Sequence, residues 1–528
     1  MTFLRVVLLL VLASLPVLAQ PAVSGVANAA SFIPAGLPNG NIAAGSMFVI
    51  FGTGLGPDTL TQVSAFPLPT NLAGTRVHIN TASAAGQADA YMIYSSATQV
   101  AAILPSSLNF NGNVDFTVTY NGRTSNSVFV RLTTSSFGAF TLSQSGLGAA
   151  VAQNYNSPED TPFNGWETPA KPGQLVILWG TGLGPVSGPE ANQPLPGQLQ
   201  LSLQVYVGGK LAQLSYYGRS GCCSGIDQVV FAVPAGVMGC TVPVVVVING
   251  IPSNVTSIAV SPDGGLCSDP LGLSSSDLQT AIQTGAARIA TISLTHSDGG
   301  NPPDSGSASF TTTPLLQYAR GLSGASAAGS CLLINGSGNA SLPSSGAAPL
   351  DAGASVQVSG PTGSGQLAKQ SNGGYTGVLP PIQAGAYTIS GNGGADVGPF
   401  TASMNVGPPI VWTNRTAITS ITPGSPVTVS WTAGDPNAFV SIEGLAVNQS
   451  TKLFGIFECT ERASANSFQI PGYITAGLPA GQGGIGLVET GTPARFSAQG
   501  VSQGFVTYIT GSAAGPFTVG ASGGGTKQ

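Results

Sequence analysis

Charged side chains are scarce in this chain of 528 residues. Lys, Arg, Asp and Glu make up 7% of the sequence, against about a quarter in an ordinary globular protein. The net charge of -5 is spread along the chain, without a stripe of basic residues. Nucleic-acid binding needs such a basic surface and is therefore excluded. Disorder of the chain as a whole is excluded as well, because it requires low hydrophobicity and 42% of these residues are hydrophobic.

Histidine is almost missing, which limits the catalytic chemistry. The chain has two histidines, His78 and His296, and a Ser-His-Asp hydrolase needs one as its general base. His78 lies in an expected strand, at a position where an internal repeat has Tyr206, so we expect no catalytic role for it. Residues 520–524 match Gly-x-Ser-x-Gly, but the pattern needs a helix after it and a glycine-rich tail follows instead.

Long apolar runs are also missing after the first nineteen residues, so no membrane-spanning helix is expected there. Residues 1–19 contain Arg5, then an unbroken apolar run from Val6 to Leu12, and they end on Ala19. This pattern is typical of a cleaved secretory signal. The sequence therefore predicts a secreted protein, extracellular or at the cell surface, with no membrane span after signal cleavage.

Cysteine is sparse, but its number is even. The six residues are Cys222, Cys223, Cys240, Cys267, Cys331 and Cys459. An even number behind a signal segment predicts disulfides. A bridge between the adjacent Cys222 and Cys223 would be strained, so we expect them to bond to Cys240 and Cys267, with the pairing left open. Cys331 and Cys459 then form a long-range bridge. Zinc is the alternative, although adjacent cysteines suit a tetrahedral site poorly.

Glycine is abundant, and one glycine-rich motif occurs twice. Residues 47–57, MFVIFGTGLGP, return as residues 175–185, LVILWGTGLGP. Residues 99–105 and 114–122 likewise match 228–234 and 242–250. A repeat much longer than the 20–50 residues of a solenoid unit indicates a duplicated domain.

The repeated glycines predict turns and not a nucleotide site. The residues concerned are Gly52, Gly54, Gly56, Gly180, Gly182 and Gly184. Their third member comes one position too early for a dinucleotide motif, a proline follows, and no helical pattern comes after it. A phosphate site would need the free N–H groups of a helix N-terminus there. We therefore expect no cofactor.

The aligned blocks have the length and alternation of β-strands. In both copies a strand ends in Asn-Gly, which is typical of a tight hairpin. About seven short strands per copy indicate a β-sandwich. We predict an all-β fold of tandem immunoglobulin-like β-sandwiches with one short connector helix. The expected segments are sandwich 1 (22–135), sandwich 2 with disulfides (136–270), a connector helix and strand (271–296), two further sandwiches (297–407 and 408–519) and a disordered tail (520–528).

The apolar strand, the Gly-x-Gly-Leu-Gly-Pro turn and the Asn-Gly hairpin followed by Ser-Asn resemble the IPT/TIG group of immunoglobulin-like domains. Both copies are also similar to an uncharacterised tandem domain of secreted acidobacterial proteins. Residues 28–32 resemble its opening, and residues 218–228, GRSGCCSGIDQ, resemble its cysteine-bearing segment. The resemblance covers residues 22–270 and implies a fold and an extracellular setting. It implies no catalytic residues.

Two tryptophans are candidate ligand contacts. Trp179 and Trp431 end expected strands and are predicted to be core residues, which leaves Trp166 and Trp412 for a sugar-binding surface. Glycoside hydrolysis would need a pair of carboxylates, and the sequence alone cannot pair its candidates Asp435, Glu443, Glu458 and Glu461. Residues 298–301 with Asp304 have calcium-ligand chemistry, although a plain turn fits them better.

The function expected from these observations is structural or adhesive and non-enzymatic, at the cell surface or in the extracellular matrix. Extracellular glycans or cell-surface proteins are the expected partners. The first alternative is a carbohydrate-binding accessory protein, and the second is an extracellular hydrolase with unidentified acidic residues.

Overall fold

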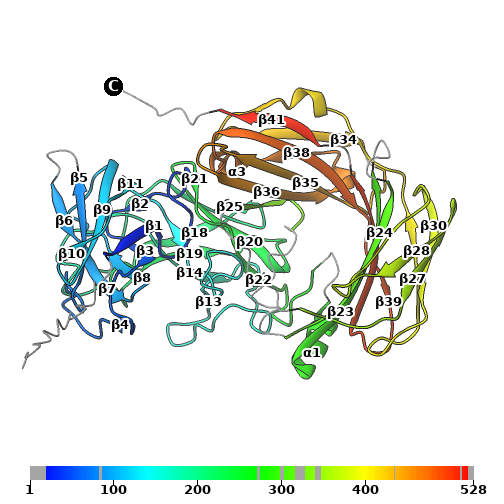
Figure 1. The fold of residues 1–528 in the computed structure, drawn as a ribbon, viewed down its shortest axis with the longest axis horizontal. Helices are drawn as coiled ribbons and strands as arrows, with labels where there is room; N and C mark the ends of the chain where they lie inside the picture. The colour runs from blue at the N-terminus through cyan, green and yellow to red at the C-terminus, as the bar shows by residue number, and fades with distance from the viewer. Residues whose placement is uncertain are drawn as a thin grey trace, which may run out of the picture.

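The computed structural model describes residues 20–81, 86–269, 274–297, 303–314, 327–338, 347–432, 434–511 and 514–520. The predicted signal segment and nearly all of the predicted tail lie outside these residues. The predicted fold class is confirmed, because the described chain is a series of β-sheets with short helices. Figure 1 shows the first sandwich at one end of the molecule, the second beside it, and the C-terminal strands above and beyond the second.

Sandwich 1 packs two sheets around one aliphatic and aromatic core. The first sheet has the order β1 (Ala22–Asn28), β3 (Met47–Thr53), β8 (Gln99–Ile103), β7 (Tyr91–Ser95) and β4 (Thr61–Gln62). The second has the order β2 (Ile42–Ala43), β11 (Val128–Thr133), β9 (Gly112–Tyr120), β5 (Thr75–Thr81) and β6 (Gln87–Asp89), with β10 (Arg123–Thr124) beside β9.

Sandwich 2 repeats this plan. One sheet has the order β12 (Gly138–Ala139), β14 (Leu175–Thr181), β19 (Asp227–Ala232), β18 (Gln213–Arg219) and β15 (Gly197–Gln198), with β13 (Ala152–Tyr155) on β14. The other has the order β17 (Lys210–Leu211), β16 (Leu203–Val207), β20 (Gly239–Ile248) and β21 (Ile251–Pro252), with β22 (Thr256–Val260) on β20. Both Asn-Gly turns adopt the left-handed conformation at each residue, as a tight hairpin requires.

The glycine motif ends a strand in both sandwiches. β3 ends at Thr53 and β14 at Thr181, and the following Gly54 and Gly182 have φ angles of 63° and 108°. Other residues are strained at such angles, so glycine suits the bend. Irregular structure follows both motifs, and the first helix in the described part of the chain is α1 (Ser275–Thr284). The motif therefore turns the chain out of a sheet and offers no helix N-terminus to a phosphate.

Helix α1 is the predicted connector helix. The Ser274 side chain accepts a hydrogen bond from the Asp277 backbone N–H, the Asp277 carboxylate accepts one from the Ser274 N–H, and Gly285 ends the helix with a φ of 72°. A second, shorter helix, α3 (Gly472–Ala476), was not expected from the sequence. Among the described residues, no helix has the length and apolar character needed to cross a bilayer.

Strand β20 is buried on both faces, which explains its continuous valine run. Val244 and Val246 point into the core of sandwich 2, whereas Val245 and Val247 belong to the core of the C-terminal region. Tyr206 of β16 extends this contact by packing on Tyr473 of α3, with ring centroids 4.7 Å apart. An uninterrupted apolar strand is typical of a sheet covered on both sides. Sandwich 2 and the C-terminal region therefore share a hydrophobic interface.

The C-terminal region contains two cores linked by one large sheet. The core that we call core 3 involves β23 (Ala286–Ser297), β24 (Ser305–Pro314), β26 (Ala348–Pro349), β27 (Ser355–Gly360), β28 (Gly363–Lys369), β29 (Tyr375–Val378), β30 (Gly385–Gly391), β31 (Phe400–Val406), β39 (Ala494–Phe496) and β40 (Gln503–Gly511). Core 4 involves β25 (Ser330–Ser337), β32 (Val411–Trp412), β33 (Ser420–Ile421), β34 (Val427–Thr432), β35 (Phe439–Val447), β36 (Leu453–Arg462), β37 (Ser467–Ile470), β38 (Gly481–Thr490) and β41 (Gly515–Val519).

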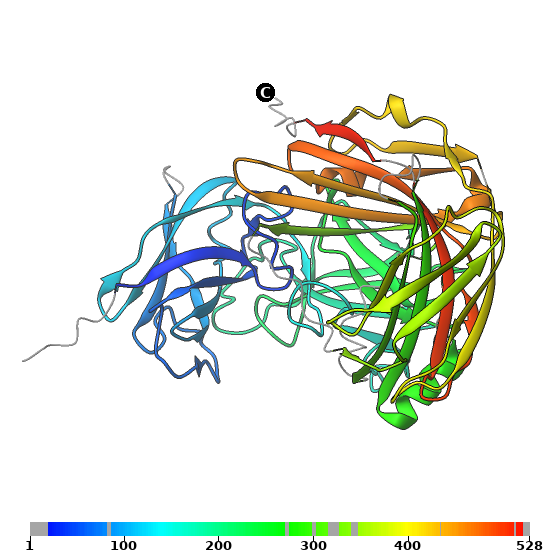
Figure 2. The ribbon, with the colours of Figure 1, turned by 45° about the vertical axis from the view of Figure 1, so that its right-hand side comes forward.

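These two cores exchange strands across the predicted boundary at residue 407. β25 precedes that boundary but pairs with β36 of core 4, and β40 follows it but runs parallel to β23 of core 3. Figure 2 shows the C-terminal strand β40, in red-orange, beside the green β23. The segments 297–407 and 408–519 are therefore intertwined and do not form two separate sequential sandwiches.

Sandwich 1 is fixed to sandwich 2 by buried polar contacts. The Asn28 side-chain amide donates to the Thr181 carbonyl, 3.2 Å away, and the Thr181 hydroxyl accepts the Met47 N–H at 2.8 Å. The Glu190 carboxylate accepts both the backbone N–H and the hydroxyl of Ser106. Because buried polar groups need hydrogen-bond partners and these find theirs across the interface, the contacts fix how the two sandwiches sit together.

Candidate functional site

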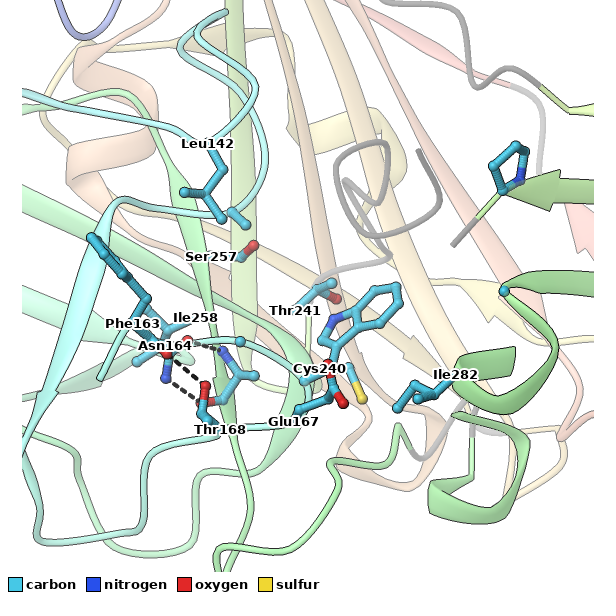
Figure 3. Close-up of a pocket in the computed structure, with 16 residues that line it drawn as sticks. Leu142, Phe163, Asn164, Glu167, Thr168, Cys240, Thr241, Ser257, Ile258 and Ile282 are labelled. Carbon is cyan, nitrogen blue, oxygen red and sulfur yellow. Dashed lines mark hydrogen bonds between the residues drawn. The ribbon is translucent and has the colours of Figure 1, made fainter. Parts of the chain in front are cut away.

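A pocket of about 600 Å³ lies where sandwich 2 meets α1 and the end of β24; we call it the seam pocket. Trp166, one of the two predicted ligand contacts, lines it. Figure 3 shows Phe163 and Ile282 on opposite sides of the pocket. The lining residues are Leu142, Ala149, Phe163, Asn164, Gly165, Trp166, Glu167, Thr168, Cys240, Thr241, Ser257, Ile258, Ala259, Ile282, Gly285 and Pro314.

The prediction that Trp412 is a ligand contact at the surface is wrong, because this residue is buried. Its side chain is 7% exposed in core 4, and the indole N–H donates to Asn414 Oδ1 at 3.0 Å. The two-residue strand β32 places Trp412 opposite Trp431 of β34, and the pair is covered by the rest of that core. Trp431 is a core residue as predicted, whereas Trp179 is only half-buried and donates to Gln153 Oε1.

The floor of the seam pocket is the edge of β22, and the Asn164 side chain completes that edge. Asn164 Oδ1 accepts the Ala259 N–H at 2.8 Å, and Asn164 Nδ2 donates to the Ala259 carbonyl at 2.9 Å. Ser257 is satisfied in the same way by the backbone of Gly148 and Ala150. The edge groups that an added peptide strand would use are already bonded. Ligand binding here therefore depends on side chains.

A disulfide between Cys240 and Cys267 lies behind Trp166 in one small cluster with Leu278 of α1. The expectation that Cys222 and Cys223 bond to these two residues is wrong. The β20–β22 hairpin places Gly239 opposite Val260, so the chain leaving β22 passes Cys240 soon afterwards. The hairpin could be predicted from the sequence. Its register brings the chain after β22 close to Cys240, and this would have indicated the bridge between Cys240 and Cys267.

Cys222 and Cys223 are exposed and carry no bridge in the structure. The predicted long-range bridge between Cys331 and Cys459 is present. It joins residues that lie directly opposite each other on β25 and β36, two strands from different sides of the predicted boundary at residue 407.

Helix α1 forms the other wall of the pocket and is held by an ion pair. Arg495 of β39 donates to both carboxylate oxygens of Asp277, at 3.1 and 2.6 Å. The hydrogen bonds from Arg495 and Ser274 keep the pKa of Asp277 below its usual value, although burial alone would raise it. The pocket wall is thus fixed to core 3 and the floor to sandwich 2.

The seam pocket is nearly uncharged. Of its lining residues, Glu167 alone has an ionisable side chain, and that side chain is exposed. The pocket is open to solvent beside Phe163 and Leu142, which are 59% and 42% exposed. Large exposed apolar side chains that line a pocket of ligand size are typical of a binding site. The arrangement can hold a neutral molecule with an apolar face.

Of the four carboxylates considered for hydrolysis, only Glu443 and Glu458 come together. Glu443 and Glu458 lie directly opposite each other on β35 and β36. Asp435 accepts the Tyr508 hydroxyl, and Glu461 accepts the N–H of its neighbour Arg462. None of the four lines the seam pocket.

The remaining candidates for site chemistry take part in local contacts. Asp304 accepts hydrogen bonds from His296, the Ser297 N–H and the Ile382 N–H. Residues 298–301 lie outside the described residues. His78 contacts Asp89, which also pairs with Arg76.

Replacing Glu443 with Gln is expected to stabilise the fold at pH 7. Burial, followed by the charge of Glu443, raises the pKa of Glu458, so the folded chain binds a proton there more readily than the unfolded chain. The resulting penalty is present above the folded pKa and disappears as the pH falls below about 4. Directly opposed like charges cost about 0.2–1 kcal/mol. Thermal unfolding of the variant at pH 7 and at a pH below about 4 measures the effect. The control is Asp58→Asn, which changes an exposed carboxylate. A gain in stability that persists at the low pH would contradict repulsion between Glu443 and Glu458 as its cause.

Comparisons with known proteins give no family. No protein-family model matches the chain, and no curated protein matches its sequence. Among solved structures, SGBP-B from a mixed-linkage glucan utilization locus of Bacteroides ovatus, in complex with a mixed-linkage heptasaccharide, is 12% identical with a TM-score of 0.15, over 87% of this chain and 95% of that one.

Two other structures are similar at the same level. A tetra-tandem repeat from the extending region of a large adhesion protein is 12% identical with a TM-score of 0.13, over 94% of this chain and 99% of that one. The N-terminal eight Ig domains of Down Syndrome Cell Adhesion Molecule are 10% identical with a TM-score of 0.14, over 93% and 56% of the two chains. TM-scores this low support no conclusion about activity.

Proposed function

We propose that this chain is a non-enzymatic extracellular protein with an adhesive role, and that it binds a neutral glycan in the seam pocket. The observation that carries the proposal is the placement of Trp166 and the exposed Phe163 in one uncharged pocket. The extracellular setting is supported by the two disulfides, which persist in oxidising compartments. We also propose that residues 22–270 belong to the IPT/TIG group of immunoglobulin-like domains that their sequence resembles.

A glycan fits the pocket better than a charged ligand or a peptide strand. A pyranose ring has an apolar face that packs on an aromatic ring and hydroxyl groups that bond to neutral polar side chains. The pocket offers Trp166 and Phe163 for the first and Thr168 and Thr241 for the second. Its volume is within the usual range of about 300–1,000 Å³ for ligand sites. The bonded edge of β22 disfavours strand addition.

The rest of the molecule suits an adhesive scaffold. Sandwich 1 is fixed to sandwich 2 through buried hydrogen bonds, and sandwich 2 to the C-terminal region through a shared core. Such interfaces limit the movement of domains relative to one another. The pocket is therefore held at a constant position in a rigid body, which suits attachment to a surface under load.

Replacing Phe163 with Ala is expected to weaken glycan binding about fivefold, because an aromatic contact contributes on the order of 1 kcal/mol. Trp166→Ala should weaken binding further, since it removes a ring that lies deeper in the pocket. The measurement is a glycan array with the full chain, followed by calorimetry on the strongest neutral ligand.

Phe129→Ala is the matched control, because Phe129 is 73% exposed on β11, far from the pocket in sequence and fold. Trp166→Phe controls for folding, since Trp166 also packs on the Cys240–Cys267 cluster. Equal binding by wild type and Phe163→Ala would overturn the assignment of the pocket. Turnover of a bound glycan by the purified chain would overturn the non-enzymatic assignment.

A further inference from the structure

The segment from Arg219 to Asp227 forms a loop whose two ends are held in the interface of sandwiches 1 and 2. Arg219, Ser220 and Asp227 are each no more than 1% exposed. Ser220 N–H donates to the Ile226 carbonyl, and the Ser224 hydroxyl donates to the Glu190 carbonyl. The base of the loop is therefore rigid.

The tip of this loop presents two neighbouring thiols to solvent. Cys222 and Cys223 are exposed, and the two side chains are close enough to hydrogen-bond to each other. Ser220 adds order, because its hydroxyl donates to Cys222 Sγ at 3.2 Å and accepts the Cys222 N–H at 3.1 Å. The loop thus holds both sulfur atoms side by side and in reach of small molecules.

The other four cysteines cannot pair with these two. Cys240 and Cys267 form one bridge and Cys331 and Cys459 the other, and all four are no more than 3% exposed. The chain therefore has two buried, permanent bridges and one exposed dithiol. Exposed or strained disulfides are the easily reduced ones, whereas buried bridges resist reduction.

We infer that Cys222 and Cys223 form a redox-active dithiol, a modification site that closes reversibly to a vicinal disulfide by exchange with an external disulfide. One thiolate attacks a sulfur of the external disulfide, that S–S bond breaks, and one external thiol leaves. The second thiolate then attacks the resulting mixed disulfide, the vicinal S–S bond forms, and the second external thiol leaves. The cysteine pair is oxidised and the external disulfide is reduced, by two electrons each.

The order of attack follows from the surroundings of the two thiols. Burial, and then the neighbouring Cys222, raise the pKa of Cys223 to about 11, so Cys223 keeps its proton more firmly than a free thiol does. Cys222 Sγ accepts the Ser220 hydroxyl, and such hydrogen bonds are stronger when the acceptor is charged, so we assign the first attack to Cys222 and the resolving step to Cys223. Proximity makes this second step intramolecular and faster than reaction with another chain. Ring strain keeps the product easy to reduce.

The test incubates the full chain with oxidised glutathione, blocks free thiols with iodoacetamide and maps the peptides by mass. We expect two alkylated cysteines before oxidation, none after it, and both again after mild treatment with reduced glutathione that leaves Cys240–Cys267 intact. Cys223→Ser should accumulate a stable glutathione adduct on Cys222, and Cys222→Ser should react far more slowly. Thermal unfolding shows whether these exposed substitutions leave the fold intact.

Three outcomes would overturn the inference. The first is that both thiols stay alkylatable after oxidation. The second is a wild type that keeps the glutathione adduct as long as Cys223→Ser does. The third is a disulfide-linked dimer of chains on a non-reducing gel, which would make the pair a crosslink between molecules.

Discussion

Replacing Arg219 with Ala is expected to lower the free energy of unfolding by about 3–5 kcal/mol, because it leaves a buried carboxylate without its cation. Arg219 Nε lies 3.3 Å from Asp227 Oδ1, and the two side chains are 1% and 0% exposed. The guanidinium also donates to the Gly45 carbonyl of sandwich 1, at 2.6 Å, and to the Gly184 carbonyl of sandwich 2, at 2.7 Å. One substitution thus removes an ion pair and a link between sandwiches.

The pH dependence of this loss has a definite sign. Burial raises the pKa of Asp227 to about 6, against the opposing effects of Arg219 and of the Leu183 and Gly182 N–H groups. Without Arg219 that pKa rises further, and the cost of the buried charge is present above it and lost as the pH falls. The variant should therefore lose more stability at pH 7.5 than at pH 5.

Chemical denaturation at the two pH values measures this loss, and limited proteolysis between the sandwiches measures the loosened link. Arg131→Ala is the control, because Arg131 is an exposed arginine on β11 of sandwich 1. A loss below 1 kcal/mol, or equal losses at both pH values, would show that Asp227 is not held as a charged partner of Arg219.

The first half of the fold could be predicted because its signals are local. The repeated glycine motif, the two Asn-Gly turns and the capping residues of α1 each act within a few residues, and each gives the expected turn, hairpin or helix. The valine run of β20 was predicted as a strand. Its second buried face was not, because that face packs on residues much further along the chain, from Cys331 of β25 onward, and sequence periodicity does not report such contacts.

The strand exchange could not be predicted for the same reason. β25 and β40 have ordinary strand patterns, and nothing in a pattern of period two states which neighbour a strand selects. The order of the strands along the chain suggested that β25 and β40 pair with strands close to them in sequence. In the structure β25 pairs with β36 and β40 with β23. Trp412 was misplaced in the same way, because core 4 covers a two-residue strand that looks exposed in sequence.

The candidate site was predictable only in part. Trp166 was found because it lies outside any strand pattern and is left over once the core tryptophans are assigned. Phe163 and Ile282 were not found, because they become pocket walls only when α1 packs beside sandwich 2. A sequence can supply the aromatic residue, whereas the partner wall depends on how two domains meet.

Replacing both Cys331 and Cys459 with Ser is expected to cost about 5 kcal/mol of stability, the largest effect of any single bridge in this chain. The bridge closes a segment with a sequence separation of 128, and the entropy lost by the unfolded chain grows with that length. Removing Cys240–Cys267, with a separation of 27, is expected to cost about 3.5 kcal/mol by the same relation.

Removing the two disulfides should also destabilise different regions of the structure. β25 is joined to core 4 by pairing with β36 and by this bridge, away from its neighbours in sequence. The double Ser variant should therefore expose the amides of β25 to hydrogen exchange while the amides of sandwich 1 stay protected. The variant that lacks Cys240–Cys267 should instead weaken glycan binding, because that bridge supports Trp166.

Denaturation of both double variants, with hydrogen exchange measured by peptide mass, checks this order. Cys222→Ser is the control, since it removes an exposed cysteine without a bridge. Equal losses in the two variants would argue against chain entropy as the source of the stabilisation. Protection of β25 that survives loss of the bridge would mean that backbone pairing with β36 alone holds the exchanged strand, and the intertwined cores would then owe their arrangement to sheet register and not to the crosslink.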